Sequence, residues 1–193
     1  MLAQQIEIEY KNLLTKLEYE ALLNHFKIET HQIKQQINHY FDTAEFALKN
    51  LRSALRIREK EGCYELTLKQ PAEVGLLETN QSLTKDDAEN MFNNARFPEG
   101  AVKVALETVG VDIESIEFFG TLTTLRAELE YMGGLLVFDS SRYLNAEDFE
   151  LEYEVTDPGE GKAVFRQLLE TMNIPLRKTD NKIQRFYNQK YQA

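Results

Sequence analysis

The chain has 193 residues, of which 42% are hydrophobic and 28% charged, and its formal net charge is −10. These values are ordinary for one folded globular domain, and the negative charge argues against broad attraction to DNA, RNA or anionic lipid. No apolar run approaches the roughly 20 residues that span a bilayer, and the first residues lack a signal-peptide pattern. We therefore expect a cytoplasmic protein that binds neither nucleic acid nor membrane.

Cysteine and histidine are too scarce to build a zinc site. Cys63 is the only cysteine, and the three histidines, His25, His31 and His39, are scattered. An intramolecular disulfide is excluded, and no Cys/His cluster can form. Any bound metal must use mainly oxygen ligands, which points to Mg²⁺, Mn²⁺ or Ca²⁺.

The first half of the chain reads as strands with one helix. Residues 4–11 alternate strictly between apolar and charged, which predicts a strand, and Thr15 followed by Glu18 has the capping-box spacing that begins a helix over 15–27. Further strands are predicted over 31–42, 51–60, 63–70 and 75–81, with a turn at Glu61-Gly62.

The second half begins with another capping-box pair, Thr84 and Asp87, which starts a second helix, and 98–115 is a loop or a helical stretch. Strands are predicted over 117–132, 135–143 and 149–156, the first two joined by a hairpin at Gly133-Gly134. Asp157 as N-cap and Pro158 at the first position start a helix, and the polar, basic tail from 176 has room for a short one. No repeat or linker interrupts 1–193, so a single domain is expected.

Basic residues gather on one face of the first predicted hairpin. A two-residue turn at Glu61-Gly62 sets Arg58 opposite Glu65 and Arg56 opposite Thr67, with Lys69 on the same side. Three cations therefore share a face.

Acidic residues gather in the same way near the other end. The same construction at Gly133-Gly134 sets Glu128 opposite Asp139, with Arg126 on that face. Strand 149–156 places three carboxylates on one side, at Glu150, Glu152 and Glu154.

Each charged face taken alone is compatible with an ordinary solvent-exposed strand. Together they are not typical of a surface, because the cations are mostly paired arginines and the acids come as Glu-x-Glu, whereas surfaces mix signs. Amphipathic helices are available to cover the apolar faces. We therefore predict an α+β protein: a closed eight-stranded antiparallel β-barrel with a charged lumen and helices packed outside. Buried charges need a partner, and a metal-bound polyphosphate supplies one.

On these residues the chain resembles the CYTH superfamily, the triphosphate tunnel metalloenzymes. The family's E-x-E-x-K signature is present as Glu7, Glu9 and Lys11, close to the N-terminus. The order and approximate spacing of the family's other charged positions hold over nearly the whole chain, at Arg56, Arg58, Lys69, Arg126, Asp139, Glu150 and Glu152. Near the C-terminus, Asn181-Lys182-Ile183-Gln184-Arg185 is similar to the family's Ser-Lys-x-x-Arg element but has Asn in place of Ser.

The resemblance implies a phosphohydrolase that acts on a small anionic triphosphate with Mg²⁺ or Mn²⁺ as cofactor. It implies triphosphate binding by Lys11, Arg56, Arg58, Lys69, Arg126, Lys182 and Arg185. It implies metal binding by Glu7, Glu9, Asp139, Glu150, Glu152 and Glu154, with Glu154 undecided. Catalytic roles fall to Asp139, which orients water or metal, and to Lys11, which is a proton acceptor if neighbouring cations lower its pKa and otherwise a phosphate contact.

Two other functions stay open at this point. One is nucleotide cyclisation, as in class IV adenylate cyclases, which needs a base-recognition pocket that the sequence does not reveal. The other is a non-catalytic sensor of polyphosphate or nucleotide. The absence of Trp removes the best stacking residue for thiamine triphosphate. The physiological substrate, the preferred metal and the oligomeric state are not determined by the sequence.

Overall fold

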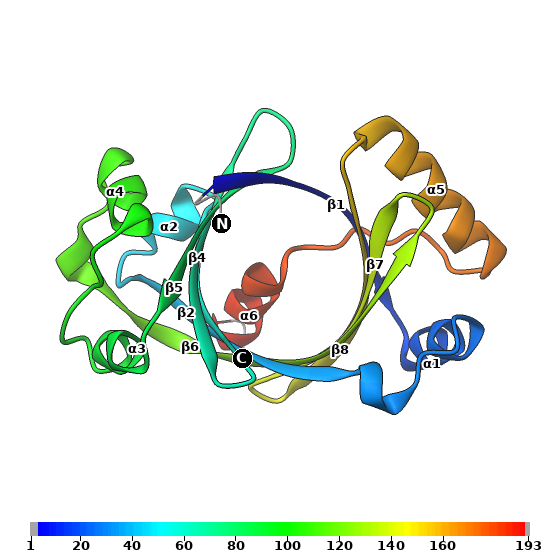
Figure 1. Cartoon of the computed structure of the whole chain (residues 1–193), viewed down its shortest axis with the longest axis horizontal. Helices are drawn as coiled ribbons and strands as arrows, with labels where there is room; N and C mark the ends of the chain where they lie inside the picture. Colours follow the sequence, from blue (N-terminus) through cyan, green and yellow to red (C-terminus); the bar gives the residue numbers. More distant parts are fainter. Residues whose placement is uncertain (1–3, 192–193) are drawn as a thin grey trace. The chain divides into compact units, whose positions relative to one another are not determined.

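The computed structural model describes residues 4–191. Within them the strands are β1 (Gln4–Leu14), β2 (Lys34–Thr43), β3 (Ala54–Lys60), β4 (Cys63–Pro71), β5 (Leu76–Leu83), β6 (Ile116–Tyr131), β7 (Gly134–Tyr143) and β8 (Ala146–Val155). They form a closed barrel in the order β1-β5-β4-β3-β2-β6-β7-β8, and every pairing whose register is known is antiparallel. The predicted eight-stranded antiparallel barrel is confirmed (Figure 1).

The helices are α1 (Lys16–His25), α2 (Ala47–Asn50), α3 (Lys85–Phe92), α4 (Ala101–Thr108), α5 (Pro158–Thr171) and α6 (Lys182–Tyr191). The predicted caps are present. Thr15 and Thr84 each form a capping box with the residue three positions on, and Asp157 accepts hydrogen bonds from the backbone N–H groups of Gly159 and Glu160. These caps satisfy N–H groups that the first turn of a helix leaves without partners, which is why the helices begin there.

Contacts divide the chain into two compact units. The first comprises the residues up to Ile6 together with Gln36–Leu122, and the second comprises Glu7–Gln35 together with the residues from Thr123 onward. In the first, the apolar faces of β3 and β4 pack against α2, α3 and α4 through Leu55, Ile57, Leu66, Leu68, Leu48, Met91 and Leu106. In the second, β7 and β8 pack against α1 and α5 through Leu136, Phe138, Leu151, Tyr153, Leu22, Phe165 and Leu168 (Figure 1).

The first hairpin has the predicted register, with Arg56 opposite Thr67 and Arg58 opposite Glu65. Its turn residues Glu61 and Gly62 have φ of 52° and 78°, as a two-residue hairpin turn with two left-handed positions requires.

The second hairpin differs from the prediction by two positions: Asp139 lies opposite Arg126, and Glu128 lies opposite Val137. Its turn consists of Met132 and Gly133, with φ of 43° and 81°, rather than Gly133-Gly134. Gly134 belongs to the strand, where a Cβ would lie 2.6 Å from the carbonyl oxygen of Glu154. Since a shift of two keeps the parity, the predicted face of each side chain is unchanged.

Three segments differ from the predicted elements. The strand predicted from 31 begins at Lys34, because a short 3-10 helix over Thr30–Gln32 precedes it. The strand predicted from 51 begins at Ala54, because the short helix α2 occupies the residues before it. That helix was not predicted, and it is held by the Asp42 carboxylate, which accepts hydrogen bonds from the backbone N–H groups of Leu48 and Lys49. Strand β8 begins at Ala146, three residues earlier than predicted, which adds Asp148 to it.

Candidate functional site

In the first unit, one face of β3 and β4 carries the three predicted cations. Arg58 Nε donates to the side-chain oxygen of Asn38 at 3.4 Å, and Lys69 Nζ lies 2.7 Å from Glu78. Arg56 Nε is buried and has no hydrogen-bond acceptor among residues 4–191. A buried guanidinium N–H without a partner costs free energy unless a ligand supplies an acceptor, which makes this face a candidate anion site.

Glu78 is a residue of this face that the sequence did not single out. It lies on β5 directly opposite Lys69 and is 6% exposed. Burial by itself would raise its pKa, but Lys69 and Arg56 outweigh burial and hold the pKa of Glu78 at about 2. The only sequence signal was a single acid within an apolar and hydroxyl-rich strand, and its partner depends on the register of β4 against β5.

In the second unit, β7 and β8 bring together the predicted carboxylates. Asp139 lies opposite Glu150, and both side chains are fully buried, while Glu152 lies opposite Val137 and is 6% exposed. On the other edge of β8, Glu9 faces Glu154 and Lys11 faces Glu152. Strand pairing alone therefore collects acids from three strands on one face.

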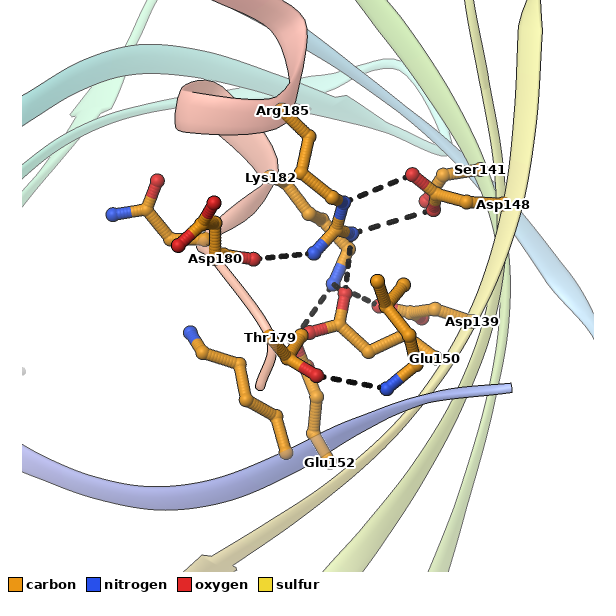
Figure 2. A network of polar contacts seen from close by, with 12 residues as sticks. Asp139, Ser141, Asp148, Glu150, Glu152, Thr179, Asp180, Lys182 and Arg185 are labelled. Carbon is orange, nitrogen blue, oxygen red and sulfur yellow. Dashed lines mark hydrogen bonds and ion pairs between the residues drawn. The ribbon is translucent and has the colours of Figure 1, made fainter. Parts of the chain in front are cut away.

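Arg126 and Lys182 each bind more than one of these carboxylates. Arg126 makes a bidentate contact with Asp139 at 2.7 and 2.6 Å and reaches Glu152 at 2.9 Å. Lys182 Nζ lies 2.8 Å from Asp139, 2.9 Å from Glu150 and 2.6 Å from Glu152 (Figure 2). Burial would raise the pKa of Glu152, but Lys182 and Arg126 hold it well below its usual value.

Helix α6 delivers Lys182 and Arg185 to this face (Figure 2). Arg185 binds Asp148 at 2.9 Å and Glu150 at 2.6 Å, and Tyr143 donates its hydroxyl to the same Asp148 at 2.7 Å. Asp148 was not among the predicted site residues, because the predicted strand began after it. Its contacts show that Arg185 is bound to two carboxylates of the described chain and thereby anchors α6.

The segment before α6 is fixed along β1. Asn12 accepts from the backbone N–H of Arg177 at 2.6 Å and donates to the carbonyl oxygen of Pro175 at 3.1 Å, while Thr179 accepts from the backbone N–H of Leu13 at 2.9 Å. This clamp sets where α6 begins, and therefore where Lys182 can reach.

Lys11 lies 2.6 Å from Glu9. Burial lowers the pKa of Lys11, but the carboxylates of Glu9, Glu150 and Glu152 more than compensate, so its pKa is raised. A lowered pKa was the condition for the proton-acceptor role, and the raised pKa of Lys11 does not meet that condition.

Glu154 shows where positive charge is deficient. Its pKa is raised to about 7, first by burial and then by Glu7, with Arg126 opposing and Glu152 and Glu9 adding to the rise. Within residues 4–191, oxygen Oε1 of Glu150 is buried and has no hydrogen-bond partner. Among the described residues, however, no three Asp, Glu, His or Cys side chains are arranged ready to hold a metal ion. The predicted donors are all carboxylates, which fits a hard divalent cation, and three of them, Asp139, Glu150 and Glu152, are bound by cationic side chains of the chain itself.

Comparison with known proteins identifies the family of the chain. The CYTH domain matches residues 5–187. This chain belongs to the CYTH domain family. The matched range includes every predicted site residue, from Glu7 to Arg185.

Relatives of this CYTH domain carry two kinds of name. A Bacillus subtilis (strain 168) protein named "Putative triphosphatase YjbK" is 49% identical over 189 residues, which cover 98% of each chain. A crystal structure described as a putative adenylate cyclase from Bacillus halodurans is 44% identical, with a TM-score of 0.94, over 96% of this chain and 100% of that one.

A more distant structure shares only the fold. An adenylyl cyclase homologue from Hippeastrum, described as having a dominant triphosphatase activity, has a TM-score of 0.79 at 23% identity and covers 95% of this chain and 96% of its own. In the described part of this CYTH domain, no helix is long and apolar enough to cross a membrane.

Proposed function

We propose that this CYTH domain is a metal-dependent hydrolase of triphosphate-bearing small molecules, with inorganic tripolyphosphate as the simplest substrate. The observation that carries the proposal is the buried network of Asp139, Glu150 and Glu152 with Arg126 and Lys182. Removing charges from water costs several kcal/mol per ion, so a protein retains such a network where the charges are used. The related protein named as a triphosphatase supports the same reaction.

The basic residues are proposed to bind the phosphates. In the first unit these are Arg56, Arg58 and Lys69, and in the second Lys11, Arg126 and Lys182. Guanidinium groups match phosphate oxygens in pairs, and fixed cations stabilise the charge that develops on the transferred phosphoryl group. Arg185 is proposed to act on the substrate only through α6, since it binds Asp148 and Glu150.

The acidic residues are proposed to hold Mg²⁺ or Mn²⁺, through Glu7, Glu9, Asp139, Glu150, Glu152 and Glu154. Enzymes of this family generally depend on a metal, and carboxylate oxygens are the ligands that hard divalent cations prefer. When bound, the cation would neutralise phosphate charge and polarise the attacking water. The protein's own contribution is to hold these carboxylates apart from water on β1, β7 and β8, with Asp139 placed to orient the water. We propose the cytoplasm as the location.

The reaction is tested by a substrate screen. Tripolyphosphate, thiamine triphosphate, ATP and GTP are each incubated with Mg²⁺ or Mn²⁺, and released phosphate and cyclic nucleotide are measured. We expect phosphate from tripolyphosphate with at least one metal. Cyclic nucleotide and pyrophosphate from ATP would support the cyclase alternative instead, which the name of the Bacillus halodurans relative favours. Binding of tripolyphosphate without any product would support the sensor.

A further inference from the structure

A buried ion pair lies within the cationic face of the first unit. Lys69 on β4 and Glu78 on β5 are directly opposite in the antiparallel register, and their charged groups are 2.7 Å apart. Their side chains are 19% and 8% exposed. The pair is therefore mostly removed from water, where an ion pair fixes geometry better than it does on a surface.

Both oxygens of the Glu78 carboxylate have a separate donor. Oε1 is bound by Lys69, and Oε2 accepts a hydrogen bond from the side-chain amide of Gln5 at 3.1 Å. A carboxylate held at both oxygens cannot rotate about its terminal bond. With a pKa of about 2, it also stays ionised throughout the neutral range. Glu78 is thus a fixed negative charge rather than a mobile one.

Arg56 lies on the same face as Glu78. Its charge helps to lower the pKa of Glu78, while its own buried Nε has no hydrogen-bond acceptor in the described part of the chain. One step further along the same strand pair, Thr67 donates to the side-chain oxygen of Asn80 at 2.8 Å. On this face, two successive cross-strand pairs of β4 and β5 are therefore bonded through their side chains, and Glu78 is the only acid in these two pairs.

We propose that Glu78 is a positioning residue, which holds Lys69 in the orientation that binds phosphate, with Gln5 fixing Glu78 in turn. This inference rests on the proposed function, because it assumes that Lys69 binds the triphosphate. A Lys ammonium has three N–H donors. One hydrogen-bonded ion pair with Glu78 can therefore fix the direction of the Lys69 side chain while another N–H group donates to a phosphate oxygen. Glu78 itself touches no substrate.

The competing role for Glu78 is simple neutralisation of buried positive charge. The two roles predict opposite changes in anion affinity when the charge of Glu78 is removed. If Glu78 only neutralises positive charge, its removal strengthens the binding of an anion, because a repulsive carboxylate is lost. If Glu78 positions Lys69, its removal weakens the binding of an anion, although the face has become more positive.

The experiment compares Glu78→Gln, Gln5→Ala and the double variant Gln5→Glu with Glu78→Gln. The matched control is Glu73→Gln, an exposed position in the loop before β5. Tripolyphosphate affinity is measured by calorimetry without metal, and KM and kcat are measured with metal. Melting temperatures identify any variant that fails to fold.

We expect Glu78→Gln to weaken tripolyphosphate binding about tenfold, the size of one lost charge-assisted hydrogen bond. KM should rise by a similar factor, and the metal concentration for half-maximal activity should not change. Gln5→Ala keeps all charges and should weaken binding two- to threefold on the same reasoning. The double variant places a carboxylate at position 5 in place of the one removed from position 78, and it should recover part of the lost affinity for tripolyphosphate. Glu73→Gln should bind tripolyphosphate as the wild type does.

Unchanged or tighter binding by Glu78→Gln overturns the inference, as does a wild-type affinity for Gln5→Ala together with no recovery in the double variant. If the wild-type protein binds tripolyphosphate but releases no phosphate, the hydrolase proposal fails while the calorimetric comparison still decides the role of Glu78. If the wild-type protein does not bind tripolyphosphate at all, both are overturned.

Discussion

The two units use the same strand alternation to make different electrostatic environments. In the first, Glu78 is paired with Lys69, and the charges of Lys69 and Arg56 hold its pKa at about 2. In the second, Glu154 lies among other carboxylates, and its pKa is about 7. Burial raises the pKa of both residues, so the difference comes from the neighbours: cations in one case and acids in the other. Among the described residues, the first face therefore leaves a buried cation, Arg56, without a hydrogen-bond acceptor at Nε, and the second is short of positive charge around Glu154.

This contrast explains why the two units should respond differently to substitution. In the first unit, Lys69 is bound to Glu78 and Arg58 to Asn38, and these two pairs share no residue. The second links three carboxylates to two cations, so a change at one position leaves several groups without compensation.

The largest effect is expected from Lys182→Met in the second unit. Three buried carboxylates lose a shared cation, so the free energy of unfolding should fall by about 3–5 kcal/mol. Urea denaturation at neutral pH measures this. The control Lys178→Met removes an exposed lysine of the segment before α6 and should change the free energy of unfolding by less than about 0.5 kcal/mol. An unchanged urea midpoint for Lys182→Met would contradict the network.

A pH experiment measures the corresponding pair in the first unit. Glu78 has a folded-state pKa of about 2, below the ordinary value of 4.5, so it stabilises the folded protein above pH 4.5 and loses that contribution as the pH falls towards 2. The contribution is at most about 3.5 kcal/mol, since each pKa unit corresponds to about 1.4 kcal/mol. The difference in unfolding free energy between wild type and Glu78→Gln should be largest above pH 4.5 and should shrink below it. A difference independent of pH would refute the assigned pKa.

Paired substitutions separate the roles of the two faces in catalysis. Glu152→Gln should lower turnover about a hundredfold, the usual cost of removing one preorganised electrostatic group, and should weaken metal binding, but tripolyphosphate binding without metal should persist or tighten. Arg56→Ala should weaken tripolyphosphate binding about tenfold with or without metal. Calorimetry with and without Mn²⁺, together with phosphate release, gives both quantities. If Mn²⁺ changed the tripolyphosphate affinity of both variants to the same extent, the two faces would not have separate roles in binding metal and phosphate.

The smallest effects should be equal in the two units. Thr15→Ala and Thr84→Ala each remove a capping box, one in α1 and one in α3, and each should lower the free energy of unfolding by about 1 kcal/mol. Thermal or urea denaturation checks this, with Thr→Ser at each position as the variant that keeps the cap. A loss confined to one unit would indicate that the other helix is held by packing alone.

The sequence by itself determined the strands, the capped helices and the face on which their side chains lie, but not the short helix α2. Alternation over β1, β3 and β8 has a period of two residues, and capping pairs such as Thr15 with Glu18 are contiguous, so both are local properties of the chain. The predicted faces also survived the error at the second hairpin, because a shift of two positions preserves parity.

Tertiary structure decided which charges meet. The register at Met132-Gly133 places Asp139 opposite Arg126, and the clamp on the segment before α6 brings Lys182 to carboxylates more than 25 residues away in the chain. Glu78 and Asp148 acquired their roles only from such partners. Each pKa depends on burial and on the distance to charges from other elements, and these quantities exist only once the strands have paired and the helices have packed.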